Sequence, residues 1–356
     1  MAYTTIDDPS KYFQAAIYTG NGGSQSITFD GNSDMQPDML WTKCRNDTFD
    51  PIIRDTSRGI SERLLVHATD AAGGATGTTA MNSDGFSLDS TNTVNNNNDT
   101  YVAWGWKCNG GTSSASGSES GSNVAYDFQV DTTAKFMINK YTGLGSDATL
   151  NLGNQFTPQF MIFKNRSQAD DWVVYHHKNT SDPDTDHLHL NTTDATADDQ
   201  EMFEDQNFAA DEINIGTNHE VNADGENYVA YAWAEVKGFS KFGSYTGNGG
   251  EPGGPFVYTG FKPAWLMIHA SSESGQAWFI CDNKRDPDNI AVAKLAANVN
   301  SAESAALGDN NWDFLSNGFK IKTQDDAMNK DGVTYLYMAF AESPFVSSEG
   351  VPTTAR

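Results

Sequence analysis

The sequence is poor in cysteine and in long apolar runs, and each shortage excludes a class of protein. Cys44, Cys108 and Cys281 are its only cysteines, and an odd number without framework spacing argues against a disulfide scaffold. Cys44 and Cys108 fall in the same repeat and could pair, but the pattern favours two thiols in a core. No apolar run approaches the roughly 18 residues of a membrane span, so membrane insertion is not expected.

Positive charge is also scarce. The chain has 22 Lys and Arg against 47 Asp and Glu, which gives a formal net charge of −25. Such a surface repels phosphate backbones, so nucleic acid is not an expected partner. The first residues lack a basic segment followed by an apolar one, so no signal peptide is expected. We therefore expect synthesis in a cytoplasm.

Motifs for nucleophilic, zinc-protease and dinucleotide chemistry are absent from the sequence. Carboxylate pairs able to cleave glycosides arise by chance in so acidic a chain. Trp172, Trp278 and Trp312 could stack on sugars, but Trp172 and Trp278 occupy equivalent apolar strands, which favours the core. The sequence predicts no catalytic residue and no enzyme.

One stretch of the chain collects polar residues that could bind a metal. They are His176, His177, His187 and His189, with Asp182, Asp184 and Asp186 between the two His pairs. A His-x-His pair places both rings on one strand face, which is a valid metal geometry. The Asp-rich loops could hold Ca²⁺, although EF-hand spacing is absent. Ordinary surface residues remain the preferred interpretation, so no metal or cofactor site is predicted and Ca²⁺ stays open.

Three landmarks recur in the same order along the chain. They are a Tyr-Thr-Gly motif at 18–20, 141–143 and 245–247, a strand after proline at 37–41, 158–163 and 263–268, and a closing strand at 101–106, 228–233 and 335–340. Repeats of about 100 residues made of short strands and polar turns are typical of β-sandwiches. The landmarks therefore predict three units of one fold.

The closing strands alternate bulky apolar residues on one face with a leading Tyr and mostly Ala or Gly on the other. Because side chains alternate across a strand, this pattern predicts sheets covered on both faces, tightly on the side of the small residues. We expect three such strands to anchor three cores.

The predicted fold class is all-β, with three tandem jelly-roll sandwiches in a row. The expected boundaries are an N-terminal arm at 1–11, sandwiches at 12–108, 124–238 and 239–345, a flexible Gly/Ser linker at 109–123, and a C-terminal arm at 346–356. The linker should leave the first sandwich loosely tethered. Short helices are expected at 291–297, 301–307 and 198–205.

Several segments resemble a known group of proteins. The opening Met1–Ser10, with Tyr12-Phe13-Gln14 and Tyr18–Gly22, resembles virion proteins of marine tailed bacteriophages such as cyanophages. The segments Phe160–Ser167 and Trp172–His176 look like the laminin-G-like, concanavalin-type repeats of that group, and the ending Ala339–Phe345 is similar. The resemblance implies jelly-roll sandwiches and a structural or tail-associated role, with no catalytic residues to carry over.

The expected function is a non-enzymatic structural protein on the exterior of a tailed-phage virion, as a capsid decoration or tail accessory. The expected partners are other virion proteins, and further copies of this chain are a second option. Two alternatives stay open: a tail adhesin that binds host surface glycan, and a glycan depolymerase. A lectin-like fold supports the adhesin only by analogy.

Overall fold

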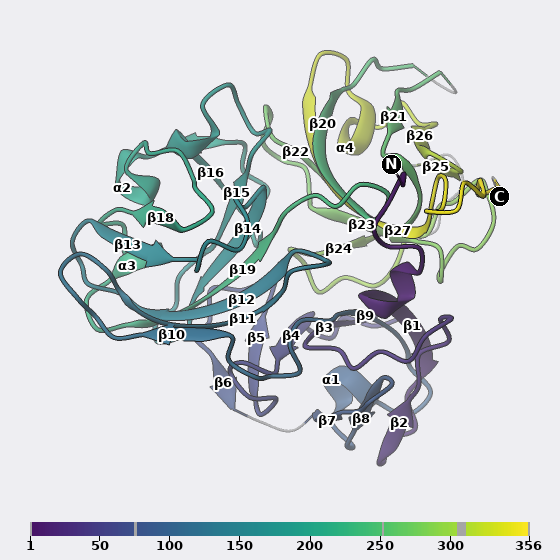
Figure 1. Cartoon of the computed structure of the whole chain (residues 1–356). Coiled ribbons are helices and arrows are strands. Elements are labelled where there is room, and N and C mark those ends of the chain that lie inside the picture. Colours follow the sequence, from purple (N-terminus) through teal and green to yellow (C-terminus); the bar gives the residue numbers. More distant parts are fainter. Residues whose placement is uncertain (1, 75–76, 251–252, 305–310, 355–356) are drawn as a thin grey trace.

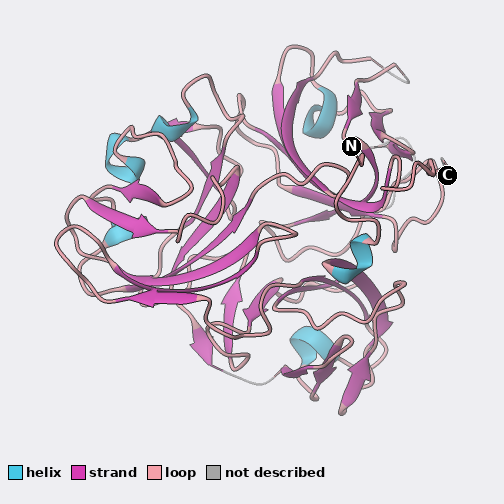
Figure 2. Ribbon diagram, in the orientation of Figure 1, coloured by secondary structure: helices cyan, strands magenta, loops and turns pink. Residues whose placement is uncertain are grey.

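Antiparallel β-structure dominates the computed structural model, which describes residues 2–74, 77–250, 253–304 and 311–354 (Figure 2). Strands make up 41% of the chain and helices 6%, which confirms the mostly β prediction. Three large sheets and three small ones are present in the described ranges.

Each large sheet has a closing strand as an inner member, with the Tyr-Thr-Gly strand on one side and the proline strand on the other. The first sheet runs β1 (Phe13–Thr19), β9 (Thr100–Trp106), β3 (Met39–Cys44), β4 (Ile52–Asp55), β5 (Glu62–Leu65), β6 (Gly73–Gly74). The second runs β10 (Ala115–Gly117), β11 (Ala125–Asp131), β12 (Phe136–Thr142), β19 (Asn227–Trp233), β14 (Phe160–Asn165), β15 (Trp172–His176), β16 (Asp186–His189), β17 (Ala197–Asp198). The third runs β20 (Ser240–Thr246), β27 (Thr334–Pro344), β22 (Phe261–Ala270), β23 (Phe279–Asp282), β24 (Leu295–Ala296).

A small sheet accompanies each large one. These sheets are β2 (Gln25–Ile27), β8 (Phe86–Leu88), β7 (Thr78–Met81); β13 (Ala148–Asn151), β18 (Glu212–Ile215); and β21 (Phe256–Tyr258), β26 (Gly318–Ile321), β25 (Trp312–Leu315). The helices are η1 (Pro9–Lys11), α1 (Asn92–Asn95), η2 (Pro183–Thr185), α2 (Gln200–Phe203), α3 (His219–Asn222) and α4 (Asp326–Asn329). We call β1–β9, β10–β19 and β20–β27 the first, second and third lobes.

The closing strands are buried on both faces, as their alternation predicts. Their small-residue faces pack in three separate clusters, one in each lobe. Their bulky faces, such as Trp104 and Trp106 of β9, all enter one further cluster that contains residues of all three lobes. We call this cluster the central core. The expectation of three cores is therefore wrong: there are three lobe cores and a fourth that the lobes share.

The lobes accordingly surround a common centre instead of following one another in a row (Figure 1). The indole of Trp106 lies 6.4 Å from that of Trp233 and 5.6 Å from that of Trp265, centroid to centroid, so one side chain links all three lobes. The sequence predicted three units in a row because that is the simplest arrangement of tandem repeats. Burial of three large aromatic faces favours the closed arrangement, because each aromatic side chain can remove roughly 150–250 Å² from water.

Polar contacts between the lobes repeat around this centre. Asp55 in the first lobe accepts a hydrogen bond from Tyr231 Oη of the second at 2.7 Å. His176 Nε2 in the second lies 3.3 Å from the carbonyl oxygen of Tyr337 in the third. Asp282 in the third accepts from Trp104 Nε1 of the first at 3.0 Å. Asp55, His176 and Asp282 hold the same register position in their sheets, so the ring of contacts closes with approximate threefold symmetry.

Main-chain bonds between lobes follow the same cycle. They are Ala72 N to Arg166 O at 3.0 Å, Thr196 N to Ser271 O at 2.8 Å and Glu303 N to Arg45 O at 2.6 Å. Lys43, Lys164 and His269, again at equivalent positions, each place a side-chain nitrogen 2.6–3.0 Å from a carbonyl oxygen of another lobe. Each lobe therefore holds a loop of its neighbour.

The Tyr-Thr-Gly motif has a packing explanation. A Cβ atom on Gly20, Gly143 or Gly247 would lie 2.1–2.3 Å from a carbonyl oxygen just after the short helix of its lobe. Each motif tyrosine also donates to a carbonyl oxygen within that helix. The glycine is needed because the backbone passes so close to the helix end.

A buried asparagine ends each of these short helices, namely Asn95, Asn222 and Asn329. Its amide group bonds to the loops on both sides, as Asn222 does to Ser146 and Gly216. Asn95 opens a run of four asparagines in the sequence and forms the fixed end of α1 in the structure.

Several local expectations need correction. The supposed flexible linker contains β10, whose residues pair with β11, and Gln129 Oε1 accepts from the amides of Asn109 and Gly111. The stretch 291–297 is not helical: it holds β24 and a bridge from Ala291 to Trp312. The helix expected at 198–205 is present as α2, and residues 305–307 of the remaining one lie outside the described ranges.

Both terminal arms pack on the body. Ile6 enters the central core and Thr4 Oγ1 donates to the carbonyl oxygen of Lys237 at 2.8 Å. Ser348 N donates to Asp7 at 2.6 Å, which ties the two arms together beside the third lobe (Figure 1). The cysteines are buried and free, in agreement with the prediction of core thiols.

Candidate functional site

The tryptophans considered as sugar platforms are buried. Trp172 and Trp312 have no exposed surface and Trp278 is 2% exposed. Trp172 Nε1 donates to the carbonyl oxygen of Leu65 in the first lobe, and Trp278 Nε1 to that of His189 in the second. Trp172 and Trp278 join the lobes, Trp312 lies in the core of the third lobe, and none of the three can stack on a ligand in this structure.

The His and Asp residues of the polar stretch separate into different environments. His176 lies between the second and third lobes, and His177 lines a groove there. Asp184 accepts a hydrogen bond from Tyr175 Oη at 3.1 Å, and Asp186 accepts one from Thr180 Oγ1. His187 and His189 stay together on one face of β16, as their spacing predicts.

A third side chain joins this pair. His189 Nε2 lies 3.1 Å from a carboxylate oxygen of Glu220, the second residue of α3. One ligand atom from each of His187, His189 and Glu220 lies within 4.8 Å of the others, and the two imidazole centroids are 5.0 Å apart. We call these three residues the His-Glu cluster. Sequence reasoning found the two histidines and missed the glutamate.

The electrostatics of the cluster reflect burial and mutual proximity. Burial, with His189 nearby, lowers the pKa of His187. Burial also acts to lower the pKa of His189, but the hydrogen bond and charge of Glu220 raise it above its ordinary value. Burial acts to raise the pKa of Glu220, but the hydrogen bond and charge of His189, together with His187 and His219, lower that pKa. The cluster lies in a negative field, since Asp171 and Asp194 also favour the charged form of His189.

The other lobes lack this cluster. The sheet register places Arg63 and Lys294 where His187 stands, and Leu65 and Ala296 where His189 stands. The short helices carry Thr93 and Ala327 in place of Glu220. This departure from the repeat is the signal that could have found Glu220 from sequence, because repeat-breaking polar residues mark functional or strained sites.

His176 leads to a prediction about pH. Its Nδ1 accepts from the amide of Lys178 at 3.0 Å, so Nε2 carries the proton and faces the carbonyl oxygen of Tyr337. Burial, with His177 beside it, lowers the pKa of His176 to about 3. The unfolded chain binds the proton near pH 6.5, so this group's contribution to stability is present above that pH and is lost as the pH falls toward 3. At pH 5 the loss is about 2 kcal/mol.

We expect His176→Gln to be less sensitive to acid than the wild type by about 2 kcal/mol between pH 8 and pH 5. Urea unfolding at both pH values measures the difference, and His219→Gln, at an exposed histidine, serves as the control. An unchanged pH dependence in His176→Gln would show that this ring is not buried as a neutral group.

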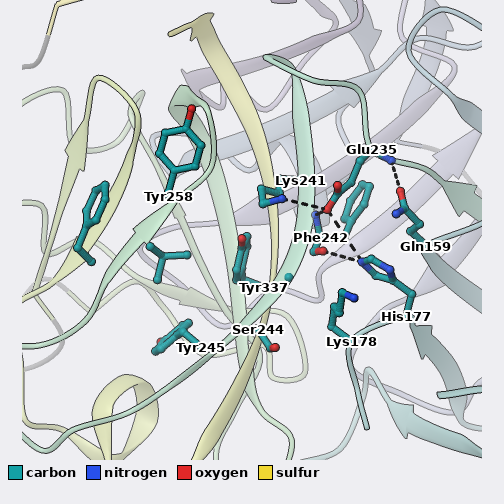
Figure 3. Close-up of a pocket in the computed structure, with 13 residues that line it drawn as sticks. Gln159, His177, Lys178, Glu235, Lys241, Phe242, Ser244, Tyr245, Tyr258 and Tyr337 are labelled. Carbon is teal, nitrogen blue, oxygen red and sulfur yellow. Dashed lines mark hydrogen bonds and ion pairs between the residues drawn. The ribbon is translucent and has the colours of Figure 1, made fainter. Parts of the chain in front are cut away.

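An open groove of about 670 Å³ lies where the second and third lobes meet (Figure 3). Gln159, His177, Lys178 and Glu235 line it from the second lobe, and β20, β21 and Tyr337 line it from the third. Phe256 is 47% exposed and Tyr258 51% exposed, while Val257 between them is buried. Two large aromatic rings therefore stand on the solvent face of β21 beside the groove.

Polar groups of both lobes fix the other wall of the groove. Glu235 accepts from the amide of Phe242 at 3.1 Å and pairs with Lys241 Nζ at 3.6 Å. His177 Nε2 lies 2.8 Å from the carbonyl oxygen of Phe242, and burial lowers the pKa of His177 (Figure 3). A groove with exposed aromatic rings and fixed donors and acceptors can take a ligand that has both apolar faces and hydroxyl groups.

The fold defines the chain as a β-rich protein of antiparallel sheets. Residues 8–344 match the family described as Domain of unknown function (DUF7483), and the chain belongs to that family. No curated protein matches the chain. Among the described residues, no helix has the length and apolar character that crossing a membrane requires.

Proposed function

We propose that this chain is a non-enzymatic structural protein on the exterior of a tailed-phage virion, built from three jelly-roll, concanavalin-like lobes. The observation that carries the proposal is the central core, because residues of all three lobes are buried together in it. The resemblance of the opening and closing segments to phage virion proteins supports it, and the net charge of −25 suits a body displayed in solution.

The arrangement also bears on how such a body attaches. The terminal arms bond to the body, so attachment falls to lobe faces and sheet edges. Approximate threefold repetition presents similar surfaces three times around one axis. A capsid or tail component with threefold symmetry is the partner that such a body fits.

Imaging of virions tests the proposal. Particles that carry this chain should show a three-lobed density on the capsid or tail, and particles from a deletion mutant should lack it. Addition of purified protein to the mutant particles should restore the density. Identical densities with and without the chain would remove the proposal.

The groove beside β21 supports a second candidate, a tail adhesin for host surface glycan. Exposed Phe256 and Tyr258 offer apolar rings for sugar faces, and Glu235, Lys241 and His177 offer polar partners for hydroxyl groups. Tyr258 Oη already lies 3.0 Å from Tyr3 Oη, which holds its ring near the groove.

If the groove binds glycan, Phe256→Ala should weaken binding about tenfold, because aromatic anchors dominate such contacts. Glycan arrays followed by titration of the best sugar provide the measurement. Val351→Ala removes another exposed apolar side chain, 64% exposed and absent from the groove lining, and should leave binding unchanged. Equal affinities for wild type and Phe256→Ala would exclude this groove as the site.

A further inference from the structure

The His-Glu cluster supports an inference that goes beyond the proposed structural role. Its ligand types are those that a first-row divalent cation prefers, since imidazole and carboxylate both bind Zn²⁺. The geometry is close to what such an ion needs. Two ligand atoms of a tetrahedral Zn²⁺ at about 2.0–2.1 Å from the metal lie about 3.3 Å apart. His189 Nε2 and the Glu220 oxygen are 3.1 Å apart.

His187 supplies an independent observation. This residue is 5% exposed, and its Nδ1 has no hydrogen-bond partner among the residues that the structure describes. A buried polar atom left unpaired costs about 1–3 kcal/mol. A cation bound between His187, His189 and Glu220 would give this ring a polar partner, and the 4.8 Å spread of the three ligand atoms leaves only a small movement to close.

The ligands also stand on well-fixed segments. The carbonyl oxygen of His189 accepts from Trp278 Nε1 of the third lobe at 2.9 Å. The amide of Glu220 donates to Asn218 Oδ1 at 2.9 Å, and Asn222 anchors the end of the same helix. Ligands held in this way lose little freedom when a metal binds.

We propose that His187, His189 and Glu220 bind one Zn²⁺ ion in the second lobe. The ion joins β16 to α3, the helix that precedes the closing strand β19, and three protein ligands leave a fourth tetrahedral position for water. The site stabilises the second lobe next to its contact with the third. It belongs to this lobe alone, because the equivalent positions of the other lobes lack the ligands.

The test uses the whole chain, purified without a His tag and stripped of metal with a chelator. Isothermal titration with Zn²⁺ should give one ion per chain, and the thermal midpoint should rise by several degrees, since a ligand that binds only the folded state stabilises it. Titration with Co²⁺ should give the intense visible absorption of a four-coordinate ion. His187→Gln and Glu220→Gln should each reduce Zn²⁺ affinity at least tenfold.

His67→Gln is the matched control. His67 also lies beside a carboxylate, 3.3 Å from Asp50, but stands outside the cluster and should leave Zn²⁺ binding intact. Two substitutions guard against a variant that fails to fold, and far-ultraviolet circular dichroism checks both. Absence of stoichiometric binding to the wild type, or equal affinity in wild type, His187→Gln and Glu220→Gln, would overturn the proposal.

Discussion

Replacement of Asp55 by asparagine should destabilise the fold by about 3–5 kcal/mol. Asp55 and Arg58 form an ion pair whose side chains are both fully buried. Burial acts to lower the pKa of Arg58, but the charge and hydrogen bond of Asp55, together with Tyr231 and Glu62, hold that pKa above its ordinary value. Loss of the carboxylate charge leaves the buried guanidinium with the part-exposed Glu62, 4.0 Å away, as its remaining ion-pair partner among the described residues. It also weakens the acceptor of Tyr231 Oη from the second lobe.

Urea unfolding of wild type and Asp55→Asn measures this effect. Asp282→Asn should destabilise the fold in the same direction, because Asp282 forms the equivalent buried pair with Arg285 and accepts a hydrogen bond from Trp104 Nε1. Glu303, 3.0 Å from Arg285, keeps part of the counter-charge there. Asp127→Asn is the control: its pair with Lys140 is partly exposed and should be worth at most about 1 kcal/mol. Equal losses at Asp55 and Asp127 would show that Asp55 is not a buried link between lobes.

The second large effect is expected at the centre of the molecule. Trp106→Ala removes a side chain that is 2% exposed and should cost about 3–5 kcal/mol. Its ring contacts Phe13 in its own lobe, Trp233 in the second, and Trp265 and Phe340 in the third. The loss should therefore lower the stability of all three lobes together, as thermal unfolding followed in the near and far ultraviolet would report.

Two further variants distinguish the effect of the size of the side chain lost from the effect of its place in the molecule. Trp106→Phe keeps a ring and removes an indole N–H that has no acceptor among the described residues, so it should cost less than Trp106→Ala. Trp312→Ala empties a site inside the core of the third lobe alone. If the three lobes unfold as one cooperative body, Trp312→Ala should lower the midpoint of the single unfolding transition. If the lobes unfold independently, Trp312→Ala would lower the midpoint of one transition and leave the others unchanged.

The sequence predicts the strands well because their signals are local. The alternation in Tyr101–Trp106 predicts a strand covered on both faces, and the structure confirms it. It does not say what covers each face, so the central core stayed hidden. A period-two pattern is the same whether the bulky face meets its own lobe or two neighbours. Burial of three such faces together is a property of the assembled chain.

In the Gly/Ser-rich stretch around Ala115–Gly117, by contrast, the local sequence signal gives the wrong prediction. Its composition is that of a flexible linker, yet pairing with β11 makes it an edge strand. Tertiary contacts override weak local preference in such segments.

The candidate sites also contain a part that local sequence predicts and a part that depends on the packing of distant segments. His187 and His189 could be predicted as neighbours because they lie two residues apart on a strand. Glu220, 31 residues from His189 along the chain, arrives through the packing of α3 on the second sheet. The groove beside β21 forms from two lobes, so its aromatic and charged walls have no common sequence pattern.

Differential scanning calorimetry of the whole chain tests the shared core most directly. A body in which three sheets bury one face together should unfold in a single transition, with the calorimetric enthalpy equal to the van't Hoff enthalpy. Two or three resolved transitions, one of which Trp312→Ala shifts while the others stay in place, would mean that the lobes fold separately and that the central core does not bind them into one unit.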